Sequence, residues 1–512
     1  MTSAQTNRAS AATLLMGSKT VVILLQLAFL PVCLKILGEE GNGFALWVMS
    51  VRSMIQLIDL DLPQGIRHSM MTNARMDEGK FWKCFQTGMV LNGIVGILGG
   101  LLLGLGWQVL NGPKYDQFQT IMPMMFGLAA FQMLADSIGS TLTHPFYAKE
   151  EFSQLAVSGS VVPSIALIFN FVLVLATRSP VAMMAAGVFE SVLTLTITLY
   201  LFRKRFGSEY LRFGFDRGVA REVISVGLRS YPGNISGRIA GTADKVILGS
   251  VAGMDFVTIY NIATKIPQSL VQIVGSATTM MVPEMVHSAQ NESAKFKTIL
   301  RRNVSFVSVL YACVMIVSAG FSVVILKAWV RKDYPGFAEL SILMAIYYTF
   351  EMNFGIITTA FYAFKKAQLL FPFALWNAVV TVFATGPISK KFGLVGLGWM
   401  NAMIDIVQLV PIHWMLTKWI VKDDTMWWYI GRLGGAIAVT TIIAGAISWA
   451  LKGVPVGREA IVFVLLMPVA SIGSFVIATR MSLVTLPNSV REKLRKRSIA
   501  VKLFGSGALK GD

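Results

Sequence analysis

The sequence CFQTGMVLNGIVGILGGLLLGLGWQV runs from Cys84 to Val109 without one charged residue. An α-helix needs about 20 mostly apolar residues to cross the hydrocarbon core of a bilayer. Runs of this kind recur along the whole chain of 512 residues. We count about fourteen, at residues 12–37, 43–61, 84–109, 119–142, 154–177, 181–202, 230–251, 258–283, 304–328, 337–361, 369–389, 395–417, 433–451 and 459–479.

The composition excludes a soluble or disordered chain. Hydrophobic residues make up 54% of the sequence and charged residues 14%, where a soluble domain carries about 25% charged residues. The three cysteines, Cys33, Cys84 and Cys313, each lie in an apolar stretch, which argues against a disulfide scaffold. The sequence therefore predicts an all-α polytopic membrane protein.

The formal net charge of +18 raises the question of nucleic-acid binding. In a membrane protein, an excess of Lys and Arg instead marks the cytoplasmic loops. With both termini inside, the fourteen-span arrangement puts roughly three times as many Lys and Arg in inside segments as in outside loops. We expect a cytoplasmic location for both termini, no cleavable signal peptide and no nucleic-acid partner.

A short internal repeat suggests two lobes. The segments Ile36–Gly41 and Ile247–Gly253 are similar, and both lie at the outer end of a predicted hairpin, about half the protein apart. Parallel repeats of this kind place a substrate site between lobes. We predict a six-helix lobe at 1–202, a basic amphipathic cytoplasmic linker at 203–229, a second six-helix lobe at 230–420, an additional helix pair at 421–479 and a basic cytoplasmic tail at 480–512.

Motifs of catalysis are absent from the sequence. It contains no G-x-x-x-x-G-K-[ST], no H-E-x-x-H and no G-x-S-x-G, and its histidines and cysteines show no metal-ligand spacing. We expect no cofactor and no metal, and transport is favoured over catalysis. An integral membrane glycosyltransferase or ligase is the enzymatic alternative, but such enzymes usually carry a large outer loop, and every outer loop here is short.

Charged residues inside the predicted spans are the candidate functional residues. A charge at the centre of a membrane helix costs about 2.5–3.5 kcal/mol, so it normally faces a cavity or a partner. The candidates for binding an anionic head group are Arg52, Arg238, Lys265, Lys19 and Lys245. The candidates for ion coupling are Asp136, Glu190, Glu351 and Asp405. Structural ion pairs, or side chains that snorkel to an interface, are the alternative interpretation.

The start of the second lobe carries a recognisable pattern. It consists of Asp244, Lys245, Leu248, Gly249, Gly253 and Tyr260, and the first hairpin has a similar Leu37-Gly38, Gly41 and Gly43-Phe44, followed by DLDLPQGIR at Asp59–Arg67. This pattern resembles the Wzx-type oligosaccharide flippases of the multidrug/oligosaccharidyl-lipid/polysaccharide (MOP) exporter superfamily. The sequence departs from many relatives at Asp61, where they have glycine.

The resemblance implies a MATE-like fold of two pseudo-symmetric six-helix lobes and an alternating-access mechanism. It also implies translocation of an undecaprenyl-pyrophosphate-linked oligosaccharide across the inner (cytoplasmic) membrane for surface polysaccharide biosynthesis. A polysaccharide polymerase and chain-length machinery are the implied protein partners, beside membrane lipid. A lipid II flippase and a cation-coupled multidrug antiporter of the same superfamily remain the alternatives. The five embedded cations fit a pyrophosphate better than a cationic drug.

Overall fold

The computed structural model describes residues 3–74, 76–110, 113–149, 151, 154, 159, 161–279, 296–300, 309–322, 324, 326, 334–364, 366–422, 426–451 and 459–480. The chain is helical almost throughout these ranges, which contain no β-strand. The all-α prediction is therefore confirmed. The side chains of Lys19 and Arg238 and the whole of the 480–512 tail beyond Arg480 lie outside the described residues.

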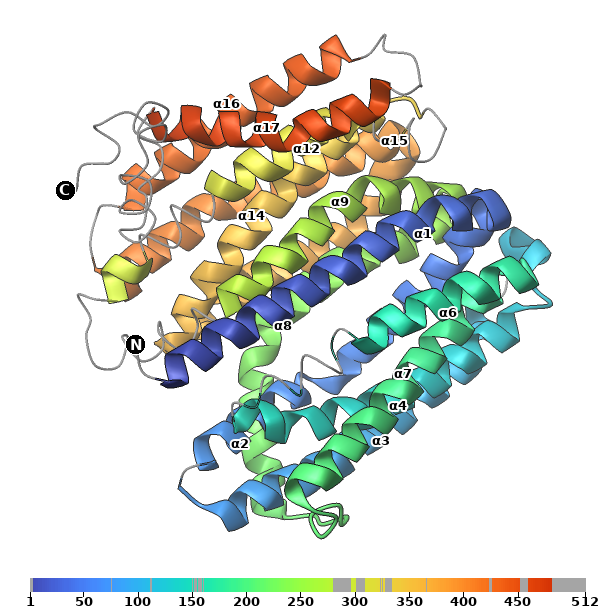
Figure 1. Ribbon diagram of the computed structural model, residues 1–512, viewed down its shortest axis with the longest axis vertical. Helices are drawn as coiled ribbons and strands as arrows, with labels where there is room; N and C mark the ends of the chain where they lie inside the picture. The colour runs from blue at the N-terminus through green and yellow to red at the C-terminus, as the bar shows by residue number, and fades with distance from the viewer. Residues whose placement is uncertain are drawn as a thin grey trace. The chain divides into compact units, whose positions relative to one another are not determined.

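The helices group into two compact units (Figure 1). Unit 1 comprises Met1–Ile259 with Leu370–Gly386, and unit 2 comprises Tyr260–Leu369 with Pro387–Asp512. The elements in unit 1 are α1 (Ser3–Ile55), η1 (Gln56–Asp59), α2 (Leu62–Asn73), α3 (Glu78–Leu110), η2 (Pro113–Phe118), α4 (Met122–Ala148), α6 (Val162–Thr177), α7 (Val181–Phe206) and α8 (Arg217–Val251). Two helices, α9 (Met254–Thr279) and α15 (Phe371–Met415), contribute to both units.

The remaining described elements belong to unit 2. They are η4 (Ala312–Ile316), α12 (Val317–Gly320), α14 (Phe337–Ala363), η5 (Ala367–Leu370, whose last residue belongs to unit 1), η6 (Leu416–Val421), α16 (Met426–Ala450) and α17 (Glu459–Arg480). The two-lobe division with boundaries at 202, 230 and 420 stays a prediction.

Two glycines interrupt the longest helices. Gly38 in α1 has φ 71° and Gly393 in α15 has φ 64°, values in the left-handed region that glycine adopts without steric cost. Each interruption falls between two predicted spans: 12–37 and 43–61 in α1, and 369–389 and 395–417 in α15. A single backbone rotation thus replaces a loop between consecutive apolar segments.

Leu60 and Asp61 form a tight left-handed turn between η1 and α2. Leu60 and Asp61 have φ values of 48° and 58°, a conformation that is uncommon outside glycine and most tolerable for Asp and Asn. The Asp61 amide donates a hydrogen bond of 2.8 Å to Oδ1 of Asp59. The turn between η1 and α2 thus has a local side-chain bond to support it.

Unit 1 is held together by two aromatic cores. One core gathers Phe44 and Trp47 of α1 against Phe118 and Phe126, and the rings of Phe44 and Phe118 stack with centroids 4.2 Å apart. The other, centred on Phe85 and Phe202, joins α2, α3, α4 and α7. Figure 1 shows α3, α4, α6 and α7 running alongside one another.

The basic segment between the predicted lobes is mostly helical. α7 ends at Phe206, and Asp216 caps α8 by accepting hydrogen bonds from the amides of Gly218 (2.9 Å) and Val219 (3.1 Å). The Val219 and Gly218 amides hold the pKa of the Asp216 carboxyl below its ordinary value. From there α8 continues for 35 residues, or about 52 Å, which exceeds the roughly 30 Å hydrocarbon core. The basic start of α8 and the predicted span 230–251 therefore form one continuous helix.

Six described helices are long and apolar enough to cross a membrane. They are Val21–Asp59, Glu78–Val109, Val181–Phe206, Phe337–Phe361, Gln368–Val421 and Ile430–Ala450. On α3 the large apolar side chains of Leu98, Leu101 and Leu105 are more than half exposed, as expected for a surface that faces lipid. These features identify a multi-pass membrane protein, while the number of fourteen spans stays a prediction.

Candidate functional site

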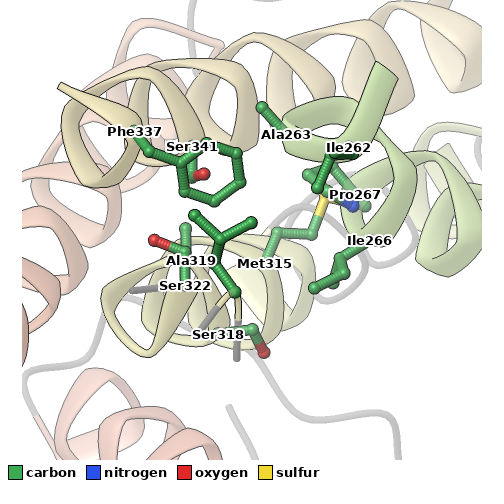
Figure 2. Close-up of a pocket in the computed structure, with 11 residues that line it drawn as sticks. Ile262, Ala263, Ile266, Pro267, Met315, Ser318, Ala319, Ser322, Phe337 and Ser341 are labelled. Carbon is green, nitrogen blue, oxygen red and sulfur yellow. The ribbon is translucent and has the colours of Figure 1, made fainter. Parts of the chain in front are cut away.

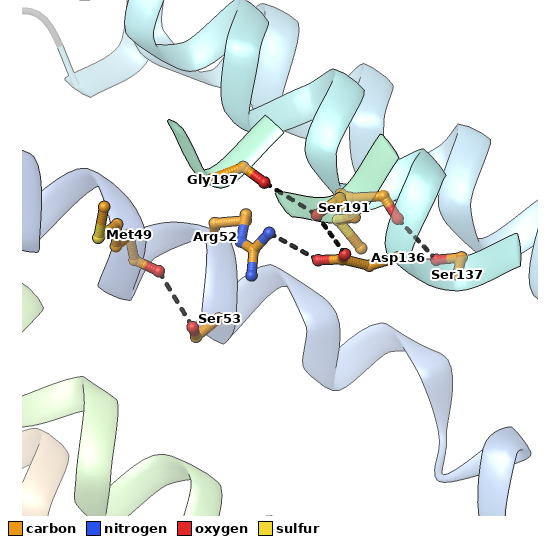
Figure 3. A network of polar contacts seen from close by, with 8 residues as sticks. Met49, Arg52, Ser53, Asp136, Ser137, Gly187 and Ser191 are labelled. Atoms are coloured by element: carbon orange, nitrogen blue, oxygen red, sulfur yellow. Dashed lines mark hydrogen bonds and ion pairs between the residues drawn. The ribbon is translucent and has the colours of Figure 1, made fainter. Parts of the chain in front are cut away.

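A charged network lies among the helices of unit 1 (Figure 3). Nη1 of Arg52 on α1 lies 2.8 Å from Oδ2 of Asp136 on α4. The other oxygen, Oδ1, accepts a 2.6 Å hydrogen bond from the Ser191 hydroxyl on α7. Three helices thus meet at one carboxylate, and this is the candidate site for charge recognition in unit 1.

Glu190 adds a second acid to this network. It precedes Ser191 on α7, is half-buried, and interacts electrostatically with Asp136 and Arg52. The side chains of Arg52 and Asp136 remain 16% and 32% exposed, so the guanidinium retains access to a solute. The structure therefore brings together three of the predicted site residues, one cation and two acids. Ser191 was missed by sequence reasoning, because a serine hydroxyl in a membrane helix can bond to a carbonyl of its own helix, as Ser191 also does with Gly187 at 3.1 Å, so its presence there gives no signal.

The family motif in α8 has a packing explanation. A Cβ atom on Gly249 would lie 2.4 Å from Cδ1 of the fully buried Trp47, and the Trp47 indole donates a 3.1 Å hydrogen bond to the carbonyl of Val246. Leu248 is fully buried, and Gly253 has φ 133°, where a side chain would be strained. These motif residues bring the first hairpin and α8 into close contact.

A second contact joins the part of α1 that follows the Gly38 interruption to the start of α9. The Asn42 amide donates a 3.2 Å hydrogen bond to the Thr258 hydroxyl, which donates a 2.7 Å bond to the carbonyl of Glu39. A Cβ atom on Gly43 would come within 1.8 Å of the Met254 carbonyl oxygen. Asn42, Trp47 and Thr258 were not among the predicted site residues. They form a hairpin clasp, which we define as residues 39–47 of α1 against residues 246–258 of α8 and α9.

The motif acid and tyrosine are both buried and hydrogen-bonded. Oδ1 of Asp244 accepts a 3.0 Å hydrogen bond from the Thr385 hydroxyl. In unit 2, the Tyr260 hydroxyl accepts a 3.0 Å bond from the Asn401 amide. Lys245 is half-buried. Asp244 thus anchors α8 to the first part of α15 within unit 1.

The predicted site residues in unit 2 lie on three helices. Lys265 on α9 is half-buried and forms no ion pair with any described residue. Glu351 on α14 is half-buried, and Asp405 on α15 is 3% exposed. The side chains of Lys19 and Arg238 are outside the described residues, so the cation-lined cavity stays a prediction.

A pocket in unit 2 is too small for a transported head group (Figure 2). It lies between α9, α12 and α14, and its volume is about 20 Å³, room for one water molecule. The hydroxyls of Ser318, Ser322 and Ser341, which line it, have no protein partner within the described part of the chain. The same part of the chain contains no cluster of three His, Cys, Asp or Glu side chains suited to a metal ion.

Comparison with known proteins places these features in a family. Residues 43–332 match the polysaccharide biosynthesis protein family. No curated protein sequence matches the chain.

Several solved structures share the fold. The lipid II flippase MurJ in its inward closed conformation aligns with a TM-score of 0.66 and 11% identity, covering 93% of this chain and 99% of MurJ. The MATE multidrug transporter DinF-BH aligns with a TM-score of 0.58 and 15% identity, covering 80% of this chain and 94% of the DinF-BH chain. A MOP superfamily transporter from Pyrococcus furiosus aligns with a TM-score of 0.56 and 12% identity, covering 80% of this chain and 95% of the Pyrococcus chain.

The chain thus shares its fold with MOP superfamily transporters of known structure. The chain is a member of the polysaccharide biosynthesis protein family.

Proposed function

We propose that this protein is a flippase that moves an undecaprenyl-pyrophosphate-linked oligosaccharide across the cytoplasmic membrane for surface polysaccharide biosynthesis. The observation that carries the proposal is membership of a polysaccharide biosynthesis family on a MOP-type transporter fold. The polar head group would pass through the protein by alternating access while the lipid tail stays in the bilayer. The protein would lie in the inner membrane with both termini cytoplasmic, and would supply a polymerase and chain-length machinery on the outer side.

Embedded cations support an anionic cargo. Arg52 uses only Nη1 in its 2.8 Å bond to Asp136, and a guanidinium offers five N–H donors in all. The unused donors can bind phosphate oxygens, which Arg recognises in a bidentate geometry. Lys265, with no carboxylate partner among the described residues, would offer a second positive charge. Arg238, Lys245 and Lys19 complete the proposed set.

The membrane potential can drive this transport. Moving a negative charge outward across an inside-negative membrane is favoured by about 2.3 kcal/mol per charge per 100 mV. A pyrophosphate diester carries about two charges, so a typical potential supplies several kcal/mol for each cargo. Cation coupling through Asp136, Glu190, Glu351 or Asp405 would add to this driving force.

Lipid II is the second candidate cargo. The fold similarity to MurJ extends over 93% of this chain, and lipid II offers the same chemistry, a pyrophosphate between a polyprenyl tail and a sugar. A cationic drug is the third candidate cargo. Arg52 and Lys265 would repel it, whereas Asp136 and Glu190 beside Arg52 would attract it.

Deletion of the gene separates these functions. We expect the deletion strain to lose one surface polysaccharide and to grow with normal cell-wall synthesis. Loss of viability with a block in cell-wall synthesis would indicate lipid II. Normal polysaccharide together with increased sensitivity to cationic dyes would contradict the proposal and indicate drug export.

A further inference from the structure

An open groove runs along the first turns of α8 in unit 1. Its volume is about 740 Å³, which falls in the range of about 300–1,000 Å³ that is usual for ligand sites. Three arginines and three large apolar side chains share its lining, namely Arg217, Arg221, Arg229, Phe215, Ile224 and Leu228. Positive charge and apolar surface therefore meet in one groove.

The groove lies on the side of α8 that is turned away from the core of unit 1. Val219 and Val223 are buried in the aromatic core that joins α2, α3, α4 and α7. A Cβ atom on Gly65 of α2 would lie 2.3 Å from the carbonyl oxygen of Val223. With 3.6 residues per turn, Arg221 and Leu228 fall on the opposite side of the helix from these valines. Helix packing within unit 1 thus leaves the groove open.

The composition of this side of α8 is typical of a membrane surface. Phe215 is 57% exposed and Leu228 is 48% exposed, and large apolar side chains interleaved with Lys and Arg characterise helices at the lipid–water interface. The predicted span 230–251 begins directly after Arg229. The first turns of α8 run obliquely to α3, α4 and α7 (Figure 1), so they extend along the membrane surface as well as away from it. We therefore expect the groove at the level of the lipid head groups.

The arginines of the groove are available to a ligand. Arg217, Arg221 and Arg229 are exposed and form no ion pair with any described residue. Arg217 also stands in the first turn of α8, where the helix dipole disfavours a positive charge. Its place there is not explained by the stability of the helix.

The acids of the same segment point their charge elsewhere. Oε2 of Glu222 lies 2.9 Å from Nζ of Lys80, and Oδ2 of Asp216 lies 3.6 Å from Nζ of Lys83. Both lysines belong to α3. Among the described residues that line the groove there is no acid, so the groove keeps its positive charge.

A phosphodiester joined to an apolar chain matches this lining. Guanidinium groups bind phosphate oxygens in a bidentate geometry, and the apolar side chains can contact the glycerol and the first acyl carbons of a lipid. A free phosphate would use only the arginines and would leave Phe215 and Leu228 in water. Clusters of Lys and Arg beside a membrane helix are typical of binding to anionic lipids.

We propose that the start of α8 binds an anionic phospholipid, with its phosphate held by the arginines of the groove and its upper acyl carbons against Phe215, Ile224 and Leu228. The bias of Lys and Arg predicts that this lipid belongs to the cytoplasmic leaflet. Because α8 is continuous from Arg217 to Val251, the bound lipid would anchor the same helix that forms the hairpin clasp at its other end. The site does not include Arg52 and does not depend on which cargo is moved.

Native mass spectrometry of the full-length protein tests the proposal. The protein is placed in nanodiscs with equal amounts of phosphatidylglycerol and phosphatidylcholine, and the lipids that stay bound after release are counted. We expect the wild-type protein to retain phosphatidylglycerol in preference. The double variant Arg217→Gln/Arg221→Gln should weaken this binding roughly ten- to thirtyfold, and Phe215→Ala should weaken it several-fold without a change in charge. Replacement of both arginines by lysine should preserve most of the binding.

The chain offers a matched control for each part of the groove. Phe213→Ala removes a ring that is 83% exposed and is not among the groove residues. Arg203→Gln with Lys204→Gln removes two exposed charges at the end of α7. Both controls should retain phosphatidylglycerol as the wild type does.

Three results would overturn the proposal. The first is equal retention of the two lipids by the wild-type protein. The second is an equal loss in the control variants, which would indicate diffuse attraction by surface charge. The third is unchanged lipid retention in Arg217→Gln/Arg221→Gln together with loss of polysaccharide export, which would assign the groove to the cargo. Lipid retention is measured without the cargo, so this test and the deletion experiment succeed or fail separately.

Discussion

The ion pair between Arg52 and Asp136 offers a decisive perturbation, because its two candidate roles predict different results. As a structural pair, it stabilises unit 1 by joining α1 to α4. As part of a binding site, its guanidinium also holds the anionic cargo. We consider the variants Arg52→Gln, Asp136→Asn and the double variant, with the Ser191 hydrogen bond preserved because Asn can still accept it.

The exposure of the pair sets the expected magnitude. Breaking a fully buried pair by removing one partner costs about 3–5 kcal/mol, whereas an exposed pair contributes about 0–1 kcal/mol. The Nη1–Oδ2 distance of 2.8 Å is short, but the side chains are 16% and 32% exposed. We therefore expect each single variant to lower the free energy of unfolding by about 1–3 kcal/mol, an intermediate value between the two cases.

A double-mutant cycle separates the roles. The purified variants are unfolded by denaturant in detergent, and polysaccharide export is measured in cells at matched membrane abundance. We expect the loss of unfolding free energy in the double variant to be smaller than the sum of the losses in the two single variants, because no unpaired charge remains buried. Export should stay low in the double variant because the cargo still lacks its cation, and Arg52→Lys should export more than Arg52→Gln.

Recovery of export in the double variant would refute the binding role and leave a purely structural pair. Normal export by Arg52→Gln would have the same consequence and would remove the main support for the cation-lined cavity.

The hairpin clasp, the cap of α8 and the topology each provide a further test. Gly43→Ala should lower the free energy of unfolding by about 1–3 kcal/mol through overpacking of the hairpin clasp, measured against Gly445→Ala, which has open space around its Cβ position. The folded pKa of Asp216 lies below its ordinary value of 3.8. The ionised Asp216 cap therefore stabilises the fold above pH 3.8, and this stabilisation is lost as the pH falls through the lowered pKa. Asp216→Asn keeps a cap that does not titrate and should flatten this part of a curve of unfolding free energy against pH. Reporters fused after Lys114 and after Arg331 should report a location outside the cytoplasm, and a reporter fused at the C-terminus should report a cytoplasmic location. A C-terminal reporter located outside would contradict the fourteen-span arrangement.

Composition and hydropathy sufficed to predict the fold class, because the cost of exposing backbone in lipid leaves few solutions besides helices. The motif around Gly249 was also recognisable, since close approach by Trp47 requires glycine there. The two turns at Gly38 and Gly393 were only implied by the gaps between apolar runs. In the structure, one glycine with positive φ connects the two apolar segments in each case, where a loop would be expected. This geometry depends on tertiary packing, which local sequence does not specify.

The candidate site was predictable only where charge was involved. Arg52, Asp136 and Glu190 attracted attention because burying a charge is costly, and the structure brings them together. Their partner Ser191 carries no such signal. The pairing of Arg52 with Asp136 depends on the packing of α1 against α4, and helical spacing within one segment could not reveal a partner so distant in the sequence.

The central claim is that the cargo is a lipid-linked oligosaccharide, and the most direct test is the amount and sidedness of that intermediate. Lipid-linked repeat units are extracted from wild-type, deletion and complemented cells and quantified by mass spectrometry. Their accessibility to a membrane-impermeant sugar-modifying reagent in intact spheroplasts then reports the leaflet. The proposed function predicts that the deletion strain accumulates the repeat unit and that it is protected from the reagent until the membrane is opened. Wild-type amounts of the repeat unit, equally accessible from outside in the deletion strain, would contradict the claim.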